Sequence, residues 1–521
     1  MNTSAEFLSH LATLLGPAGI RTSPEDTRPY ATDWRRRYSG TPLAVVFPRS
    51  THEVAEIVKA ANQFGVALIP QGGNTGLTGA TVPDGSGSQV ILNLSRMHQI
   101  RGQDALNKTL TVEAGVTMQA AQEAAEAMGL LFPLSLPARG TATIGGNLAT
   151  NAGGTAVLRY GNARALCLGL EVVTAQGEIW DGLRGLRKDN TGYDLRDLFI
   201  GSEGTLGVIT AAVLALMPKP AGIATALARV PSMEAALSLL AHAQDRADAQ
   251  LTGFEMMTPA AVGLALAYYP ALGRGIEMLA SGGAHGSKGA GGDPRASSIN
   301  GGLSPLVLLE VSSPESEQAG QDLLERILSE ALEKGIADDA LVARSFAQSR
   351  SFWDIREHIT LAASEDGPHI KHDISLPISA IPAFVQETDT FLQAQWPGVR
   401  LINFGHLGDG NLHYNVAPPL ASAQTHAQGA QDTQADSDRA TRHRAYKLFL
   451  AAHEEAIRKA VHDRVVALGG SISAEHGLGL LRRDEAAFYK SPVEMGLMRA
   501  IKQALDPKGL MNPGKVLTKS S

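Results

Sequence analysis

Cysteine is almost absent from this chain, with one, Cys167, among 521 residues. A single thiol excludes an internal disulfide and any metal or iron–sulfur site built from several cysteines. Cys167 lies in the apolar run 165–173, where the simplest interpretation is a small core residue. The sequence also lacks an uninterrupted apolar run of about 18 residues, so it predicts no transmembrane helix.

A signal peptide and an excess of positive charge are also lacking. Residues 1–19 carry an early glutamate and no basic region, a pattern typical of an amphipathic helix and not of a cleavable signal. We therefore expect a cytoplasmic protein. The net charge of −7 argues against nucleic acid as a partner, and the run Arg35–Arg37 is interpreted as a local solvated patch. The length predicts two or three domains of roughly 100–200 residues each.

Among the features that are present, a pair of histidines stands out. The segment 401–419 places His406 and His413 on either side of a Gly-Asp-Gly-Asn cluster, 408–411. Apolar residues lead into and out of this cluster, a pattern that predicts a β-hairpin. With a four-residue loop, His406 faces His413 across the strands, and Asn415 shares that face. Opposed Cβ atoms lie roughly 4.5–5.5 Å apart, close enough for both imidazoles to bind one metal ion.

Histidines beside a turn are more often structural or solvated, so the pair alone is weak evidence for a metal site. A second polar cluster, 471–479, adds Glu475 and His476 between small residues. Two histidines and one carboxylate can bind Zn²⁺ or Mn²⁺ and leave a coordination position open for a substrate. The sequence therefore predicts a catalytic metal site made of His406, His413 and Glu475.

Glycine is abundant, at 55 residues, and gathers in three clusters at 70–80, 140–161 and 188–210. The first follows a predicted strand, after a helix predicted over 51–65 with Thr51 as its N-cap. Backbone N–H groups of such a loop converge on an anion, although one glycine-rich turn is weak evidence. It is neither a Rossmann fingerprint nor a Walker A loop. Three such loops predict an elongated cofactor whose pyrophosphate is bound by backbone amides.

Two polar stretches, 281–302 and 421–444, are rich in small or polar residues and poor in apolar ones. Neither shows helical or strand periodicity. We expect both to be mobile and to carry no chemistry.

Six motifs occur in order along the chain, and together they resemble one family. They are 70-PQGGNTGLTG-79, 144-IGGNLATNAGG-154, 189-DNTGYDLRDLFIGSEGTLGVIT-210, 405-GHLGDGNLHYN-415, 473-SAEHGLG-479 and 506-DPKGLMNPGKVL-517. The series resembles the vanillyl-alcohol oxidase and p-cresol methylhydroxylase flavoproteins. It is most similar to their FAD-linked D-2-hydroxy-acid dehydrogenase branch, and to the D-2-hydroxyglutarate enzymes before those acting on D-lactate or glycolate.

The resemblance implies an α+β fold with two domains. Residues 1–220 would form the FAD-binding domain, and 221–521 a substrate domain with an antiparallel, ferredoxin-like sheet whose last helices pack back on the first domain. FAD-binding residues would be Pro70, Gly72, Gly73, Asn74, Thr75, Gly76 and Leu77 around the pyrophosphate, Thr143, Gly146, Asn147, Asn151 and Gly153 along the isoalloxazine and ribityl chain, Val208 and Ile209 at the adenine end, and Asn512. Relatives that attach the flavin covalently carry histidine at the position of Asn74, so the resemblance implies non-covalent FAD.

By the same resemblance, the substrate-binding residues are Arg356, Thr360, Lys371, Asn415 and His476. On the predicted helix 352–365, Arg356 and Thr360 are also i, i+4 neighbours on one face. The expected reaction oxidises a D-2-hydroxy acid to the 2-oxo acid, with hydride transfer to flavin N5 and His476 as the catalytic general base. Arg356 and Lys371 together favour a dicarboxylate, 2-hydroxyglutarate, with D-lactate or glycolate as the alternative.

The expected partners are the small 2-hydroxy acid and an electron acceptor, which could be an electron-transfer flavoprotein, a quinone or another carrier. A homodimer is among the expected assemblies. Two other classes of function stay open at this point. A metallohydrolase could use the same histidines and glutamate without flavin, and a non-catalytic subunit could retain the FAD loops without turnover.

Overall fold

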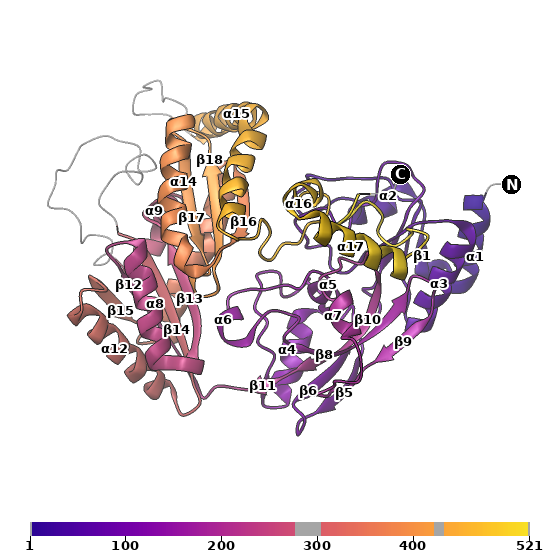
Figure 1. Ribbon diagram of the computed structural model, residues 1–521, viewed down its shortest axis with the longest axis horizontal. Coiled ribbons are helices and arrows are strands. Elements are labelled where there is room, and N and C mark those ends of the chain that lie inside the picture. Colours follow the sequence, from indigo (N-terminus) through magenta and orange to yellow (C-terminus); the bar gives the residue numbers. More distant parts are fainter. Residues whose placement is uncertain (1–2, 277–303, 421–431, 519–521) are drawn as a thin grey trace. The chain divides into compact units, whose positions relative to one another are not determined.

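The structure, a computed structural model, describes residues 3–276, 304–420 and 432–518. The chain divides into two compact units (Figure 1), one formed by Met1–Lys219 with Glu475–Ser521 and the other by Pro220–Ala474. The sequence assigns the last helices to the second domain. In the structure, residues from Glu475 onward group with the first unit.

The first unit begins with helices that pack on a four-stranded sheet of order β1-β2-β4-β3. Its elements are α1 (Thr3–Leu15), β1 (Ile20–Arg21), α2 (Pro24–Thr27), β2 (Ala44–Val46), α3 (Thr51–Phe64), β3 (Leu68–Gln71) and β4 (Val90–Asn93). The predicted helix at 51–65 is present, but its N-cap is Ser50, whose hydroxyl accepts from the Glu53 N–H. Thr51 instead donates to the buried Glu171 carboxylate at 2.5 Å.

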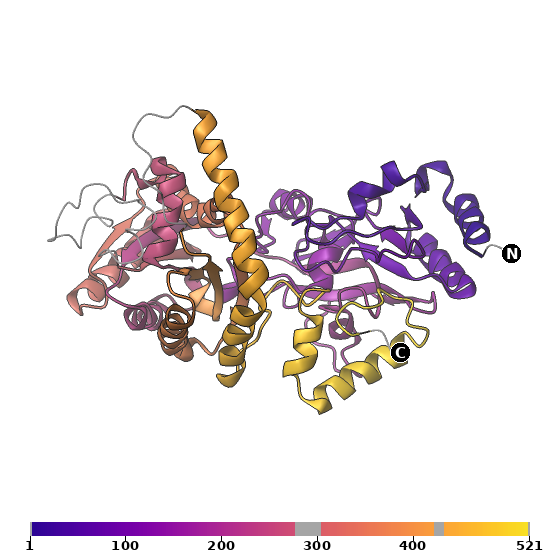
Figure 2. The ribbon, with the colours of Figure 1, turned by 90° about the horizontal axis from the view of Figure 1, so that it is seen from above.

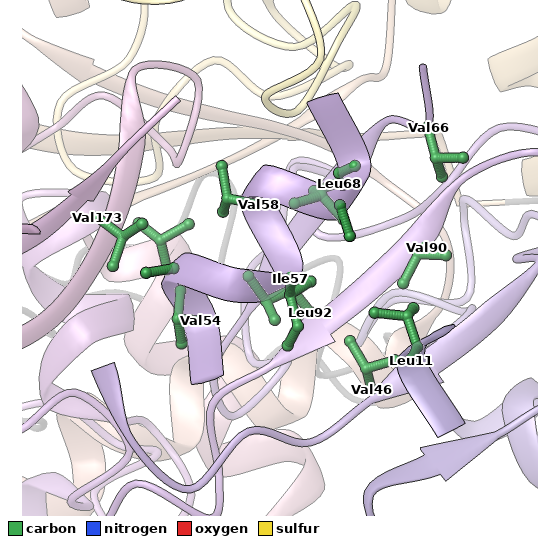
Figure 3. Close-up of a cluster of buried hydrophobic side chains, with 14 of the residues drawn as sticks. Leu11, Val46, Val54, Ile57, Val58, Val66, Leu68, Val90, Leu92 and Val173 are labelled. Carbon is green, nitrogen blue, oxygen red and sulfur yellow. The ribbon is translucent and has the colours of Figure 1, made fainter. Parts of the chain in front are cut away.

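The core of this layer is aliphatic (Figure 3), with side chains from α1, α3 and the parallel strands β2, β3 and β4 in one cluster. Val54, Ile57 and Val58 recur at helical spacing on the buried face of α3 and pack on Leu68 and Leu92. This burial holds β3 in place, and the first glycine-rich loop begins directly after that strand.

A second, antiparallel sheet of order β5-β6-β10-β8-β9 carries the other two glycine-rich loops. Its strands are β5 (Ile100–Asp104), β6 (Thr109–Glu113), β8 (Cys167–Thr174), β9 (Ile179–Gly182) and β10 (Gly207–Ala215). Cys167 is buried, as predicted, and burial raises the pKa of its thiol to about 12. The unit also contains α4 (Met118–Ala127), β7 (Leu130–Leu131), α5 (Ile144–Ala149), α6 (Val157–Tyr160), α7 (Leu195–Phe199), β11 (Met217–Pro218), α16 (Arg483–Tyr489) and α17 (Pro492–Leu505).

The second unit is built on a seven-stranded antiparallel sheet of order β15-β12-β14-β13-β17-β18-β16. Its first four strands, with α8 and α12, have the predicted ferredoxin-like order. The elements are β12 (Gly222–Arg229), α8 (Met233–Ala247), β13 (Leu251–Met257), α9 (Pro259–Tyr268), β14 (Leu306–Ser313), α12 (Glu317–Glu333), β15 (Asp339–Val342), α13 (Phe346–Asp366), β16 (Ile370–Ser375), α14 (Ile381–Gln395), β17 (Arg400–Gly405), β18 (Asn411–Ala417) and α15 (Asp432–Ala467).

Strand alternation separates the two faces of this sheet. On one face, α12 packs against β12, and α15, the long helix in Figure 2, packs against β16 and brings His462 within 5.3 Å of the His372 ring. On the other face, α9 and α13 cover an apolar cluster that includes Leu227 and Phe404. This second face becomes polar toward β18 and β16.

Two predictions about this unit are wrong. His413 pairs with Phe404 and not with His406, because β17 ends at Gly405 and the loop 406–410 contains a 3₁₀ turn and Gly410 at φ 84°. The shift is by two positions, so it preserves the faces of the strands. The stretch 421–444 was expected to lack regular structure, yet its residues from Asp432 onward belong to α15. Residues 281–302 and 421–431 lie outside the described part of the chain.

Candidate active site

The three glycine-rich loops of the first unit meet one another. A Cβ atom on Gly72 would lie 2.2 Å from the Thr143 hydroxyl oxygen, and one on Gly73 would lie 1.9 Å from the Thr141 carbonyl oxygen. The third loop packs against the first, where a Cβ on Gly204 would lie 3.0 Å from the Pro70 ring. Glycine at these positions therefore lets three backbone segments approach more closely than side chains would allow.

The first loop presents a series of backbone donors. Among the described residues, the N–H groups of Gly72 to Leu77, which include Thr75 and Gly76, have no hydrogen-bond acceptor. Asn74 sits at φ 53°, its amide donates to the Thr32 carbonyl at 2.9 Å, and its oxygen accepts from the Thr81 hydroxyl at 2.7 Å. Consecutive N–H groups in such a loop suit a phosphate or pyrophosphate.

Two buried asparagines add unsatisfied polar atoms to the same unit. Asn147 Nδ2 and Asn512 Oδ1 have no partner among the described residues, while the Asn512 amide donates to the carbonyls of Ala80 and Glu203. Buried polar atoms in proteins normally have partners, so these two fit a bound polar cofactor. Thr143 caps α5 by accepting from the Gly146 N–H at 3.3 Å.

The remaining predicted cofactor residues divide into two groups. Asn151 sits at φ 51° beside Gly153, where a Cβ would lie 3.1 Å from a Glu475 carboxylate oxygen. Val208 and Ile209 are buried on β10, where they belong to the two hydrophobic clusters of this unit.

The segment that carries Glu475 and His476 is hydrogen-bonded to the glycine-rich loops of its own unit. Glu475 accepts from the Gly154 N–H at 3.3 Å, and its other oxygen lies 3.6 Å from His476 Nε2. Glu203 is buried below this segment and accepts from the N–H groups of Leu478 and Gly479 at 2.7 and 2.9 Å. Burial raises the pKa of Glu203 to about 7, although these N–H groups and the Lys515 charge act in the opposite direction.

In the second unit, the polar face near β16 and β18 gathers four predicted or newly found site residues. Lys371 is opposite Asn415, and Asp373 is opposite His413. The His406 and His413 rings lie 5.5 Å apart between centroids despite the altered register. The Ala474 N–H donates to the Asp373 carbonyl at 3.1 Å, so the peptide that leads into Glu475 is held beside β16.

Glu255 on β13 is the residue that the sequence prediction missed. It is 1% exposed, and its oxygens accept separately from Arg356 Nε at 2.7 Å and His406 Nδ1 at 2.5 Å. Burial alone would raise the pKa of this carboxyl, but its bonded neighbours His406 and Arg356 lower it to about 2. A single glutamate in the apolar run 251–257 is the sequence signal that could have identified it.

The two residues predicted on helix α13 differ in environment. Arg356 is 7% exposed, and its guanidinium lies 4.6 Å above the Phe404 ring. Apart from Nε, its nitrogens have no acceptor among the described residues. Thr360, one turn later, is exposed, and Lys371 is half-buried.

Two protein families match this chain, and both agree with the cofactor class that the glycine-rich loops indicate. An FAD binding domain family matches residues 42–182, and the family "FAD linked oxidases, C-terminal domain" matches residues 219–516.

The described helices include none long and apolar enough to cross a membrane.

Two relatives are similar over nearly their whole length. D-2-hydroxyglutarate dehydrogenase of Xanthomonas citri pv. viticola is 36% identical over 498 residues, which cover 95% of this chain and 94% of that protein. The protein of the same name from Stutzerimonas stutzeri is 33% identical, with 99% of each chain covered. The structure of p-cresol methylhydroxylase with substrate bound aligns at a TM-score of 0.70 and 15% identity over 100% of this chain and 98% of that chain, which shows likeness of fold alone.

Proposed function

The chain belongs to the family of FAD-linked oxidases, and we propose that it oxidises D-2-hydroxyglutarate to 2-oxoglutarate. The observation that carries this proposal is the similarity along nearly the whole chain to proteins named D-2-hydroxyglutarate dehydrogenase. The buried Arg356 and the half-buried Lys371 support a substrate with two carboxylates, because a monocarboxylate needs fewer cations.

The first unit fits FAD through its own backbone. The N–H groups of Gly72 to Leu77 would bind the pyrophosphate, and Asn147 and Asn512 would contact the cofactor with their unsatisfied atoms. Bound FAD supplies the hydride acceptor for the reaction. Asn74 has no nucleophilic nitrogen and its amide is bonded within the protein, so the cofactor would be held non-covalently.

Two histidines and one glutamate supply the ligand atoms of the proposed metal site. We assign His406, His413 and Glu475 as ligands of a divalent ion, Zn²⁺ or Mn²⁺, whose Lewis acidity would acidify the substrate hydroxyl. The two imidazoles are close enough to share one ion, and the His406 Nδ1–H···Glu255 bond makes Nε2 the coordinating nitrogen. Asp373, opposite His413, is a further carboxylate beside them.

The remaining residues position the substrate and move its proton. Arg356 and Lys371 would bind carboxylates, and Asn415 would donate a hydrogen bond from its buried amide. Thr360 would add a hydroxyl group to these substrate-binding residues. His476 would accept the proton of the hydroxyl as the hydride leaves Cα, so that the substrate loses two electrons and two hydrogens.

The proposal is tested by anaerobic reduction of the purified, FAD-loaded enzyme with a panel of D- and L-2-hydroxy acids. D-2-hydroxyglutarate should bleach the visible flavin band fastest, and its L enantiomer should not bleach it. Faster bleaching by D-lactate or glycolate would refute the dicarboxylate preference. Bleaching by no member of the panel would refute the dehydrogenase function itself.

A further inference from the structure

The carboxylate of Glu255 is shared between two residues of the proposed site. One oxygen accepts from His406 and the other from Arg356, with bonds of 2.5 and 2.7 Å. The three side chains are buried, at 1, 7 and 7% exposure for Glu255, Arg356 and His406. They come from β13, from α13 and from the loop after β17, so the carboxylate joins three elements that are distant in sequence.

The bond to His406 determines which ring nitrogen can bind a metal. A Glu255 oxygen that accepts from His406 assigns the imidazole hydrogen to Nδ1. The lone pair then lies on Nε2, and the ring is held in one orientation. A carboxylate that accepts from a metal-binding histidine in this way raises the basicity of the ligand and fixes its tautomer.

The bond to Arg356 determines how much of the guanidinium is available to a substrate. Nε is used by Glu255, and the planar group stacks over Phe404 at 4.6 Å. The two terminal nitrogens have no acceptor among the described residues. They form a fork of matched geometry for a carboxylate.

A buried ion pair can also be merely structural. Glu310, on the same face of the sheet, is a carboxylate whose contacts are structural. It accepts from Trp353 Nε1 at 2.8 Å and from the Thr225 hydroxyl at 3.5 Å, both neutral donors outside the proposed site. Glu255 differs because both of its partners are residues assigned to metal or substrate binding.

We propose that Glu255 is a positioning residue that orients His406 toward the metal ion and Arg356 toward a substrate carboxylate at the same time, an inference that rests on the proposed function. Metal affinity and recognition of the substrate carboxylate are then coupled through one side chain. Loss of its charge impairs both, whereas loss of a structural carboxylate impairs neither.

The test compares Glu255→Gln with Glu310→Gln in the FAD-loaded, full-length enzyme. Gln replaces one of the two acceptor oxygens with an NH₂ donor group, so its two ends cannot accept separately from Arg356 and His406 as the carboxylate does. Zn²⁺ affinity, measured by competition with a chromogenic chelator in the absence of substrate, should fall roughly 10–100-fold in Glu255→Gln. The KM for D-2-hydroxyglutarate should rise more than kcat falls. FAD content should equal that of wild type, and Glu310→Gln should match wild type in all readouts.

A second variant keeps the proposal testable if Glu255→Gln misfolds. Glu255→Asp keeps the charge but shortens the side chain by one methylene, so it should show the same pattern at smaller magnitude. Wild-type Zn²⁺ affinity and KM in Glu255→Gln would overturn the role of Glu255. An equal loss in Glu310→Gln would also overturn it, because the effect would then be structural. Wild-type enzyme that binds no Zn²⁺ and is not reduced by any 2-hydroxy acid would instead refute the proposed function.

Discussion

Two buried glutamates, Glu203 in the first unit and Glu255 in the second, have opposite electrostatic environments. Glu203 accepts from two neutral backbone N–H groups, and burial raises its pKa to about 7. Glu255 accepts from Arg356 and His406, and these two neighbours outweigh the same burial and lower its pKa to about 2. The comparison shows how the two proposed sites differ: backbone N–H groups and glycines form the loops of the first unit, and side chains that can carry charge pair with one another around Glu255 in the second.

The largest expected effect on cofactor binding concerns the backbone of the first unit. Gly73→Ala places a Cβ 1.9 Å from the Thr141 carbonyl oxygen, so the loops must separate. Overpacking of this kind costs about 1–3 kcal/mol, which corresponds to roughly 10–100-fold weaker FAD binding. Titration of the apoprotein with FAD measures it. Gly85→Ala is the matched control, because a Cβ there meets nothing within 4 Å and Gly85 lies outside the three glycine-rich loops. Equal FAD affinity of the two variants would contradict the close-packed loops.

The largest expected effect on stability concerns the charges of the second unit. Arg356→Met leaves the buried Glu255 with one partner, and breaking a buried pair from one side costs roughly 3–5 kcal/mol. Arg350→Met is the control on the same helix, since its ion pairs with Asp354 and Glu357 are solvent-exposed and contribute about 1 kcal/mol or less. Denaturant unfolding monitored by circular dichroism distinguishes the two. A similar loss in both variants would mean that Glu255 does not depend on Arg356.

The smallest effect is a pH dependence in the first unit. A raised carboxyl pKa means that the folded state binds the proton more tightly than the unfolded state, whose pKa is near 4.5. This contribution is present in full below pH 4.5 and is lost as the pH rises through about 7, a change of at most about 3 kcal/mol. Glu203→Gln should flatten the dependence of the melting temperature on pH over this window. The exposed Glu178→Gln should leave it unchanged, and an unaltered slope in Glu203→Gln would exclude Glu203 as its source.

The same contrast explains what could be read from the sequence. The loops of the first unit are local motifs, so their glycines and the cofactor class follow from adjacent residues such as Gly72, Gly73 and Asn74. The helix at 51–64 was also predictable, because Val54, Ile57 and Val58 recur at helical spacing. Only its cap was misassigned by one residue, since Ser50 and Thr51 both carry a hydroxyl that can cap a helix.

The second unit was harder to predict because its site depends on contacts between distant residues. Glu255 bonds residues 101 and 151 positions away, and no local pattern encodes those pairs. The hairpin register was wrong by two positions because the 3₁₀ turn at Leu407–Asp409 lengthens the loop. The histidines nevertheless come together, since a shift of two preserves strand faces.

FAD binding is assigned to one set of residues, and metal and carboxylate binding to another. Single-turnover reduction of the metal-stripped holoenzyme tests this assignment most directly. The protein should retain its FAD after exhaustive chelation, yet reduction by D-2-hydroxyglutarate should slow by at least about 100-fold, in line with the contribution of a metal ion or general base to such steps. Added Zn²⁺ or Mn²⁺ should restore the rate. Full-rate flavin reduction in the metal-stripped enzyme would contradict the assignment.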